Sequence, residues 1–208
     1  RTVGDVLLAA CGESISAEAG ELRPIPHRWF DGIPGNPLVS IPEGETITDL
    51  FLQQADRGAA RIVAADQTRG AVSYRDVITA VYVLSRVIEA LPSERVGIML
   101  PASVAADILF LSTLFAGKTP VMVNWTAGVR NVKHSLDLVD CQHVLTARAL
   151  VSRLKTQGID LSDLSDRLVF LEEVGKEISL WTKVKAALKA RLTWAPLRRA
   201  QVSSTAVI

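Results

Sequence analysis

A short loop with the sequence Asn-Trp-Thr-Ala-Gly holds the residues of this chain best suited to bind a ligand. It follows an apolar run that predicts a strand, and a helical pattern follows it. Asn124 and Thr126 can form side-chain hydrogen bonds, and the start of the helix adds main-chain donors. We expect the substrate to contact Asn124, Trp125, Thr126 and Gly128. The alternative is that Asn124 and Thr126 only cap the helix and Trp125 only packs.

No other group of residues predicts a familiar chemistry. The sequence lacks the Gly-x-Gly-x-x-Gly and Gly-x-x-x-x-Gly-Lys motifs for phosphates, and the Gly-x-Ser-x-Gly motif for a nucleophilic serine. His134 and His143 have no obvious serine or cysteine partner. Glu172 and Glu173 end an apolar run that reads as a strand, so their side chains should point in opposite directions. We therefore assign no catalytic and no cofactor-binding residue.

The composition excludes several classes of protein. Cys11 and Cys141 lie far apart and form no metal-ligand spacing with His27, His134 or His143, so no metal site is expected. A formal net charge of +1 gives no general reason to expect nucleic acid as a partner. No apolar run approaches the roughly 18 residues that a membrane span needs. Two unpaired thiols favour the cytoplasm, and association with the inner face of the membrane is a further option.

Regular alternation of strands and helices begins in the second quarter of the chain. A helix ending near Gly58 leads to an expected hairpin at 60–74, followed by a helix at 75–91. Further strands are expected at 95–100, 119–124, 142–147 and 168–173, with helices at 104–117, 129–140 and 148–158 between them. Such short connections predict an α/β fold, a largely parallel sheet flanked by helices. Ligands of such sheets lie beyond the carboxyl ends of the strands, here at loops 101–105 and 124–128.

The two ends of the chain differ from this centre. Residues 1–44 are rich in proline and predict an extended lead-in, which Trp29 and Phe30 should pin to a neighbouring surface, whereas 45–208 form the second part. Near the other end, an amphipathic helix is expected at 178–192. Trp181, Val184, Leu188 and Leu192 lie roughly along one side, and the basic residues Lys183, Lys185, Lys189 and Arg191 lie on the other, with Arg198 and Arg199 following.

This tail helix has two interpretations. It is either a surface helix whose apolar side packs on the sheet, or, over 178–199, a segment that lies on an anionic membrane surface. Beyond it, the residues "SSTAVI" predict the start of another strand.

Three segments together resemble a known family. "AVSYRDV" resembles the Leu-Thr-Tyr-x-Glu-Leu segment of adenylate-forming (AMP-binding) enzymes, with Asp76 where that pattern has Glu. "ERVGIMLPASVAADILFLSTLFAGKTPVMVN" resembles the block that follows in those enzymes. "VNWTAGV" together with "HVLTAR" is most similar to the acyl-[acyl-carrier-protein] synthetase / 2-acylglycerophosphoethanolamine acyltransferase branch. The resemblance covers about residues 46–208.

The resemblance implies a function for a longer parent protein. In this family the strand that matches "TAVI" leads into a phosphate-binding loop, so the chain would be an N-terminal subdomain truncated before that loop and inactive alone. The parent would be an AMP-forming ligase that uses ATP and Mg²⁺ to convert a fatty acid to acyl-AMP. The acyl group would then pass to acyl-carrier protein, coenzyme A or a lysophospholipid. The alternative is a non-enzymatic α/β module that binds a partner protein or a membrane surface.

Overall fold

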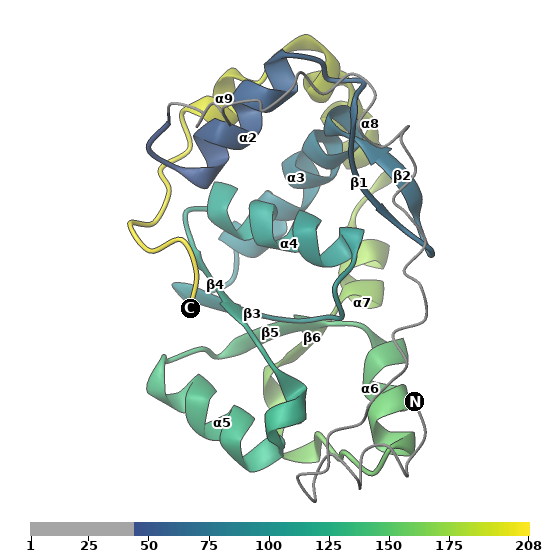
Figure 1. Ribbon diagram of the computed structural model, residues 1–208, viewed down its shortest axis with the longest axis vertical. Helices are drawn as coiled ribbons and strands as arrows, with labels where there is room; N and C mark the ends of the chain where they lie inside the picture. The colour runs from purple at the N-terminus through teal and green to yellow at the C-terminus, as the bar shows by residue number, and fades with distance from the viewer. Residues whose placement is uncertain (1–43) are drawn as a thin grey trace, which may run out of the picture. The chain divides into compact units, whose positions relative to one another are not determined.

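A parallel four-stranded sheet lies at the centre of residues 44–208, the part of the chain that the computed structural model describes (Figure 1). The order of the strands across the sheet is β4-β3-β5-β6. Their bounds are β3 (Arg95–Met99), β4 (Thr119–Met122), β5 (His143–Thr146) and β6 (Leu168–Phe170). The expected α/β class with a parallel sheet is therefore confirmed. The expected lead-in, with Cys11, His27, Trp29 and Phe30, lies outside the described residues.

Helices cover both faces of this sheet (Figure 1). The two that precede β3 and β4 are α3 (Tyr74–Glu89) and α4 (Val104–Phe115). Those on the other face are α5 (Val129–Leu138) and α6 (Arg148–Thr156), and the short 3-10 helices η2 (Trp125–Ala127) and η3 (Ser162–Arg167) lie in the connecting loops. Because adjacent parallel strands need a crossover helix, this arrangement follows from the alternation in the sequence.

Successive side chains of the inner strands β3 and β5 point to opposite faces of the sheet. In β3, Val96 and Ile98 join a cluster with Leu109 of α4, whereas Met99 belongs to the cluster on the side of α5 and α6. In β5, Leu145 faces the first cluster and Val144 the second. Both faces are buried, which is why these strands read as continuous apolar runs instead of alternating ones.

A hairpin lies outside the main sheet, as expected. Its strands are β1 (Ile62–Asp66) and β2 (Gly70–Ser73), which pair antiparallel. Ser73 ends β2 and caps α3: its hydroxyl accepts from Asp76 N at 3.3 Å, and the Asp76 carboxylate accepts from Ser73 N at 2.8 Å. This reciprocal pair is a capping box, which stops the strand and starts the helix within two residues.

Three further helices pack around α3 and α4. They are α2 (Ile47–Asp56), α8 (Leu180–Leu192) and α9 (Ala195–Arg198). Of the two interpretations of this tail helix, the one in which its large apolar residues pack is wrong. Ala186 and Ala190 are the buried residues of α8, whereas Trp181, Val184, Leu188 and Leu192 are exposed.

The last expected strand of the sheet is shorter than the sequence suggested. β6 ends at Phe170, and Leu171–Glu177 form helix α7, so the residues expected at 171–173 of a strand are helical. At the chain's final residue, Ile208 N donates to Pro120 O at 3.0 Å and Ile208 O accepts from Met122 N at 2.9 Å. These are the two bonds that one residue of a parallel strand makes, although 203–208 form no assigned strand. Within residues 44–208, every helix is too short or too polar to cross a bilayer.

Candidate functional site

The loop after β4 forms a tight local structure of its own. Asn124 Oδ1 accepts from Thr126 N at 3.1 Å and from Thr126 Oγ1 at 2.7 Å. The Asn124 side chain therefore caps η2, as the capping interpretation expected. Because its oxygen is occupied by Thr126, the group of Asn124 that can serve a ligand is the side-chain amide nitrogen. The Thr126 hydroxyl donates inward, so it can accept from a ligand.

Trp125 and Gly128 complete this loop in different ways. Trp125 is half-buried and packs against the cluster under α5 and α6, so it fixes the loop to the core. Gly128 has φ 86° and ψ 145°, a conformation that is essentially restricted to glycine. A Cβ on Gly128 would meet no atom within 4 Å, so backbone conformation alone requires glycine there. The side chain of Asn131 supports the turn from the other side by donating to Ala127 O at 2.8 Å.

 A small apolar cavity opens beside the loop. The cavity beside the loop measures about 160 Å³, compared with about 450 Å³ for a second cavity between α3, α8 and α9. Its walls come from β4, the loop and α5, and the lining residues are Val121, Met122, Val123, Asn124, Ala127, Val132, Ser135 and Leu136. Asn124 and Ser135 are the polar side chains among them, so the cavity suits a hydrocarbon group better than a phosphate.

The helix that follows this loop starts differently from its two neighbours. Val104 N, at the start of α4, donates to the carboxylate of Asp66 in the hairpin at 2.9 Å. Arg148 N, at the start of α6, donates to Glu172 Oε1 at 2.9 Å. Helix α5 begins after Gly128, and within residues 44–208 no side chain caps it. Among α4, α5 and α6, the helix whose first main-chain donors a ligand could use is therefore α5, whereas loop 101–105 is occupied by a protein carboxylate.

The Asp66 carboxylate has unusual electrostatics for a surface group. It accepts main-chain hydrogen bonds from Arg69 at 2.5 Å, from Val104 and from Thr68, and these lower its pKa below the ordinary value. The pKa of Asp107, in the first turn of α4, is raised by lost hydration and by the charge of Asp66. The start of α4 thus binds one internal anion already.

Glu172 and Glu173 correct an expectation from the sequence. Because they lie in α7 and not in a strand, their side chains do not point in opposite directions: both reach Arg148. Glu172 binds the main-chain nitrogen of Arg148, and Glu173 forms an ion pair with its guanidinium, which also lies 4.2 Å from the centre of the Phe170 ring. Both carboxylates hold α6 against α7.

At the opposite edge of the sheet, His143 has a partner that the sequence did not indicate. Ser93 Oγ lies 2.5 Å from His143 Nδ1, although 50 positions separate the two residues. Buried Lys118 donates to the carbonyl oxygens of Leu91 and, at 2.8 Å, of Ser93. Burial and the charge of Lys118 lower the pKa of His143. The group joins the loop before β3 to the first residues of β4 and β5, and it lies at the end of the strands where such sheets do not bind ligands.

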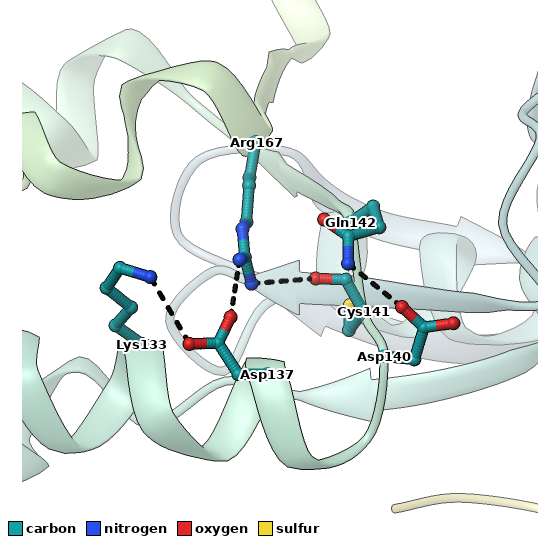
Figure 2. A network of polar contacts seen from close by, with 6 residues as sticks. All are labelled: Lys133, Asp137, Asp140, Cys141, Gln142 and Arg167. Carbon is teal, nitrogen blue, oxygen red and sulfur yellow. Dashed lines mark hydrogen bonds and ion pairs between the residues drawn. The ribbon is translucent and has the colours of Figure 1, made fainter.

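A second polar network lies at the end of α5 (Figure 2). Asp137 pairs with Lys133 at 3.2 Å and with Arg167 at 2.5 Å, and these two hydrogen bonds lower its pKa. Arg167 also donates to Cys141 O at 3.3 Å. Cys141 itself is a buried free thiol whose pKa is raised by burial, so it has the properties of a core residue and not of a nucleophile.

Residues 44–208 contain no group of three His, Cys, Asp or Glu side chains that could hold a metal ion.

Comparison with known proteins agrees with this geometry. Residues 51–202 match the family model described as AMP-binding enzyme, which is more than half of the chain. Among solved structures, VinN is similar with a TM-score of 0.55 at 14% identity, covering 72% of this chain and 38% of that one. The N-terminal subdomain of NpsA from Klebsiella oxytoca has a TM-score of 0.51 at 14% identity, with 65% of this chain and 33% of that chain covered.

A third similar structure is AB3403, a four-domain nonribosomal peptide synthetase bound to AMP and glycine. Its TM-score is 0.51 at 16% identity, and the match covers 69% of this chain and 10% of that one. Identities this low establish a shared fold. This chain spans 38% or less of the length of all three structures.

Proposed function

Because the chain belongs to the AMP-binding enzyme family, we propose that it forms the N-terminal part of an enzyme that activates a fatty acid with ATP. The observation that carries this proposal is the family match over residues 51–202. The fatty acid, as opposed to another carboxylic acid, is supported by the similarity of "VNWTAGV" to the acyl-[acyl-carrier-protein] synthetase branch.

In the proposed reaction a carboxylate oxygen of the fatty acid attacks the α-phosphorus of ATP. A new oxygen–phosphorus bond forms, the bond to the leaving pyrophosphate breaks, and acyl-AMP results. A thiol of acyl-carrier protein or coenzyme A, or a hydroxyl of a lysophospholipid, then attacks the acyl carbon and displaces AMP. Charge that develops at phosphorus needs positive groups, and the described residues at the loop after β4 do not include them.

The contribution of this chain to the proposed reaction is to hold part of the substrate. The apolar cavity beside β4 suits an acyl chain, and Met122, which is 46% exposed, forms part of its wall. The Asn124 amide nitrogen, the Thr126 oxygen and the main-chain donors at the start of α5 suit polar atoms at the rim. Substrate would thus lie at the carboxyl edge of β4.

The test is ATP–pyrophosphate exchange in a longer protein that includes this chain and the remainder of the family's catalytic domain. We expect exchange to depend on added fatty acid and to be weaker with benzoate or amino acids, whereas the 208-residue chain alone should give none. Exchange that responds to benzoate or an amino acid but not to fatty acids would refute the choice of substrate. Incubating the same protein with labelled fatty acid and each acceptor in turn would identify carrier protein, coenzyme A or lysophospholipid as the acyl acceptor.

A further inference from the structure

Helix α8 is amphipathic in the reverse of the usual sense. At about 100° per residue, Trp181, Val184, Leu188 and Leu192 fall on one side of the helix, and Ala186 and Ala190 fall on the opposite side. The two alanines are 4% and 1% exposed, whereas Trp181 is 74% and Leu192 is 80% exposed. The four large residues are called the α8 stripe below.

The small side of α8 holds it to the protein. Ala186 and Ala190 belong to the same core cluster as Ile78, Val81 and Tyr82 of α3, and α8 runs beside α3 (Figure 1). The end of α8 is also fixed, because the Tyr82 hydroxyl donates to Thr193 O at 2.7 Å. Docking through alanines brings the two helices close together and leaves the stripe pointing away from α3 along the length of α8, about 20 Å.

Basic residues border the stripe on both sides. Lys185 and Lys189 follow it on one side in the helical projection and Arg191 lies on the other, whereas Lys183 lies on the side of the buried alanines. Lys183 and Arg191 line a cavity of about 430 Å³ together with Arg69 and Arg75, which face α8 from the hairpin turn and the start of α3. Asp76 is the acidic residue of that lining, so four basic side chains face one carboxylate there.

The charge of this region is opposite to that of the remainder of the chain. Residues 178–199 carry six basic and no acidic residues, which leaves 17 of the 23 basic residues against all 22 acidic ones elsewhere. A surface that combines large apolar side chains, a tryptophan and flanking lysines matches a bilayer with anionic headgroups, because the apolar residues can enter the acyl boundary while the ammonium groups remain at the phosphates.

We propose that α8 is a membrane-contacting helix, whose stripe inserts into the surface of an anionic lipid bilayer while Lys185, Lys189 and Arg191 contact the headgroups. The proposal does not depend on acyl activation, since it rests on the exposure and charge of α8 alone. The occupant is a bilayer and not a single lipid, because the stripe extends along the whole helix and does not enclose a binding cavity of its own.

The first test is sedimentation of the full 208-residue chain with phosphatidylcholine vesicles, with and without phosphatidylglycerol. We expect binding to the anionic vesicles that falls as salt is raised from about 0.1 M to about 1 M, where the screening length drops from about 10 Å to about 3 Å. Leu188→Glu should reduce the partition coefficient about tenfold or more, because it places a carboxylate in the centre of the stripe. The double variant Lys185→Glu/Lys189→Glu should reduce it selectively for anionic vesicles.

The matched control is Leu138→Glu on α5. Leu138 is 72% exposed, so this variant adds the same charge at a similarly exposed leucine on another helix, and its vesicle binding should equal that of the parent chain. Circular dichroism and thermal unfolding establish that all variants fold. Quenching of tryptophan emission by brominated lipid, present in the parent chain and reduced in Trp181→Phe, would support insertion of the stripe directly.

Two results would overturn the proposal. One is equal vesicle binding by Leu188→Glu and the parent chain, which would place the contact elsewhere. The other is absence of vesicle binding together with a dimer that Leu188→Glu dissociates, which would show that a second copy of the chain covers the stripe.

Discussion

The carboxylate of Asp66 accepts a hydrogen bond from the main-chain nitrogen of Val104 at 2.9 Å, across 38 positions of sequence. This contact joins the β1–β2 hairpin to the start of α4. The same carboxylate also closes the hairpin's own turn through Thr68 N at 2.9 Å and Arg69 N at 2.5 Å. One side chain therefore satisfies donors of two separate elements.

Replacing Asp66 by Ala should destabilise the chain at neutral pH, because three main-chain donors lose their acceptor. The folded pKa of Asp66 lies below its ordinary value of 3.8, so its contribution is fully present above that value and is lost as the pH falls through the lower folded pKa. Urea unfolding at a series of pH values should show a gap between parent and variant that narrows in acid. The exposed Asp163→Ala is the control; a gap that widened in acid would contradict the assignment.

The capping box of α3 gives a prediction about side-chain length. Asp76→Ala should reduce the free energy of unfolding by about 1 kcal/mol, since Ser73 N loses its acceptor. Asp76→Glu should recover most of the loss, because Glu is the residue usually found at this position of a capping box. A double-mutant cycle with Ser73→Ala measures the coupling directly, and additive effects of the two changes would show that the two side chains act separately.

Gly128 and Gly175 should respond to alanine with opposite signs. Gly128 has φ 86°, so Gly128→Ala should destabilise by about 1 to 3 kcal/mol although a Cβ has open space there. Gly175 lies in α7, and its Cβ would also meet no atom within 4 Å. Gly175→Ala should stabilise by up to about 1 kcal/mol. Thermal unfolding of the two variants tests this prediction. Equal changes in stability would rule out a conformational role for Gly128.

Asn124 and Thr126 should matter more for turnover than for folding. In a longer enzyme, Asn124→Ala and Thr126→Ala should each lower turnover about tenfold or more, which corresponds to roughly 1.4 kcal/mol of lost transition-state stabilisation. Each should cost about 1 kcal/mol of stability as a lost cap. Thr46→Ala removes the cap of α2 and is the control, expected to lose stability but not turnover. If all three variants lost turnover in proportion to their loss of stability, the role of the loop would be purely structural.

Cys141 should be unreactive in the folded chain. In a Cys11→Ser variant, a disulfide reagent should modify Cys141 only as the protein unfolds, because the thiol is buried and its raised pKa keeps it neutral to higher pH than a free thiol. The rate of modification measured against denaturant concentration tests this. Rapid modification of the native protein would show that the thiol is accessible.

Most of the regular elements were predictable because each one follows from a local pattern. The periods of α3 and α4 and the apolar runs of β3 and β4 specify helices and parallel strands without knowledge of the contacts between them. The loop at Asn124 could also be located, since it follows a predicted strand. Its capping bond to Thr126 is likewise local and was among the expected alternatives.

The remainder depends on contacts between distant residues. Ser93 and His143 meet across 50 positions, and no spacing in the sequence signals that pair. The packing interpretation of α8 was wrong because large apolar residues are ordinarily those that pack, whereas here Ala186 and Ala190 fit against α3. Glu172 and Glu173 were expected in a strand because the apolar run that precedes them does not mark where β6 ends.

The pairing of Ile208 with β4 closes the outer edge of the sheet. Thr119 N and Val123 N donate inward, to Glu94 O just before β3 and to Ile98 O within β3. The donors that face outward belong to positions 120 and 122: Pro120 has no N–H, and Met122 N is bonded to Ile208. An exposed edge strand is a template on which another chain can add a strand and start aggregation, and over β4 that template has no free donor to offer.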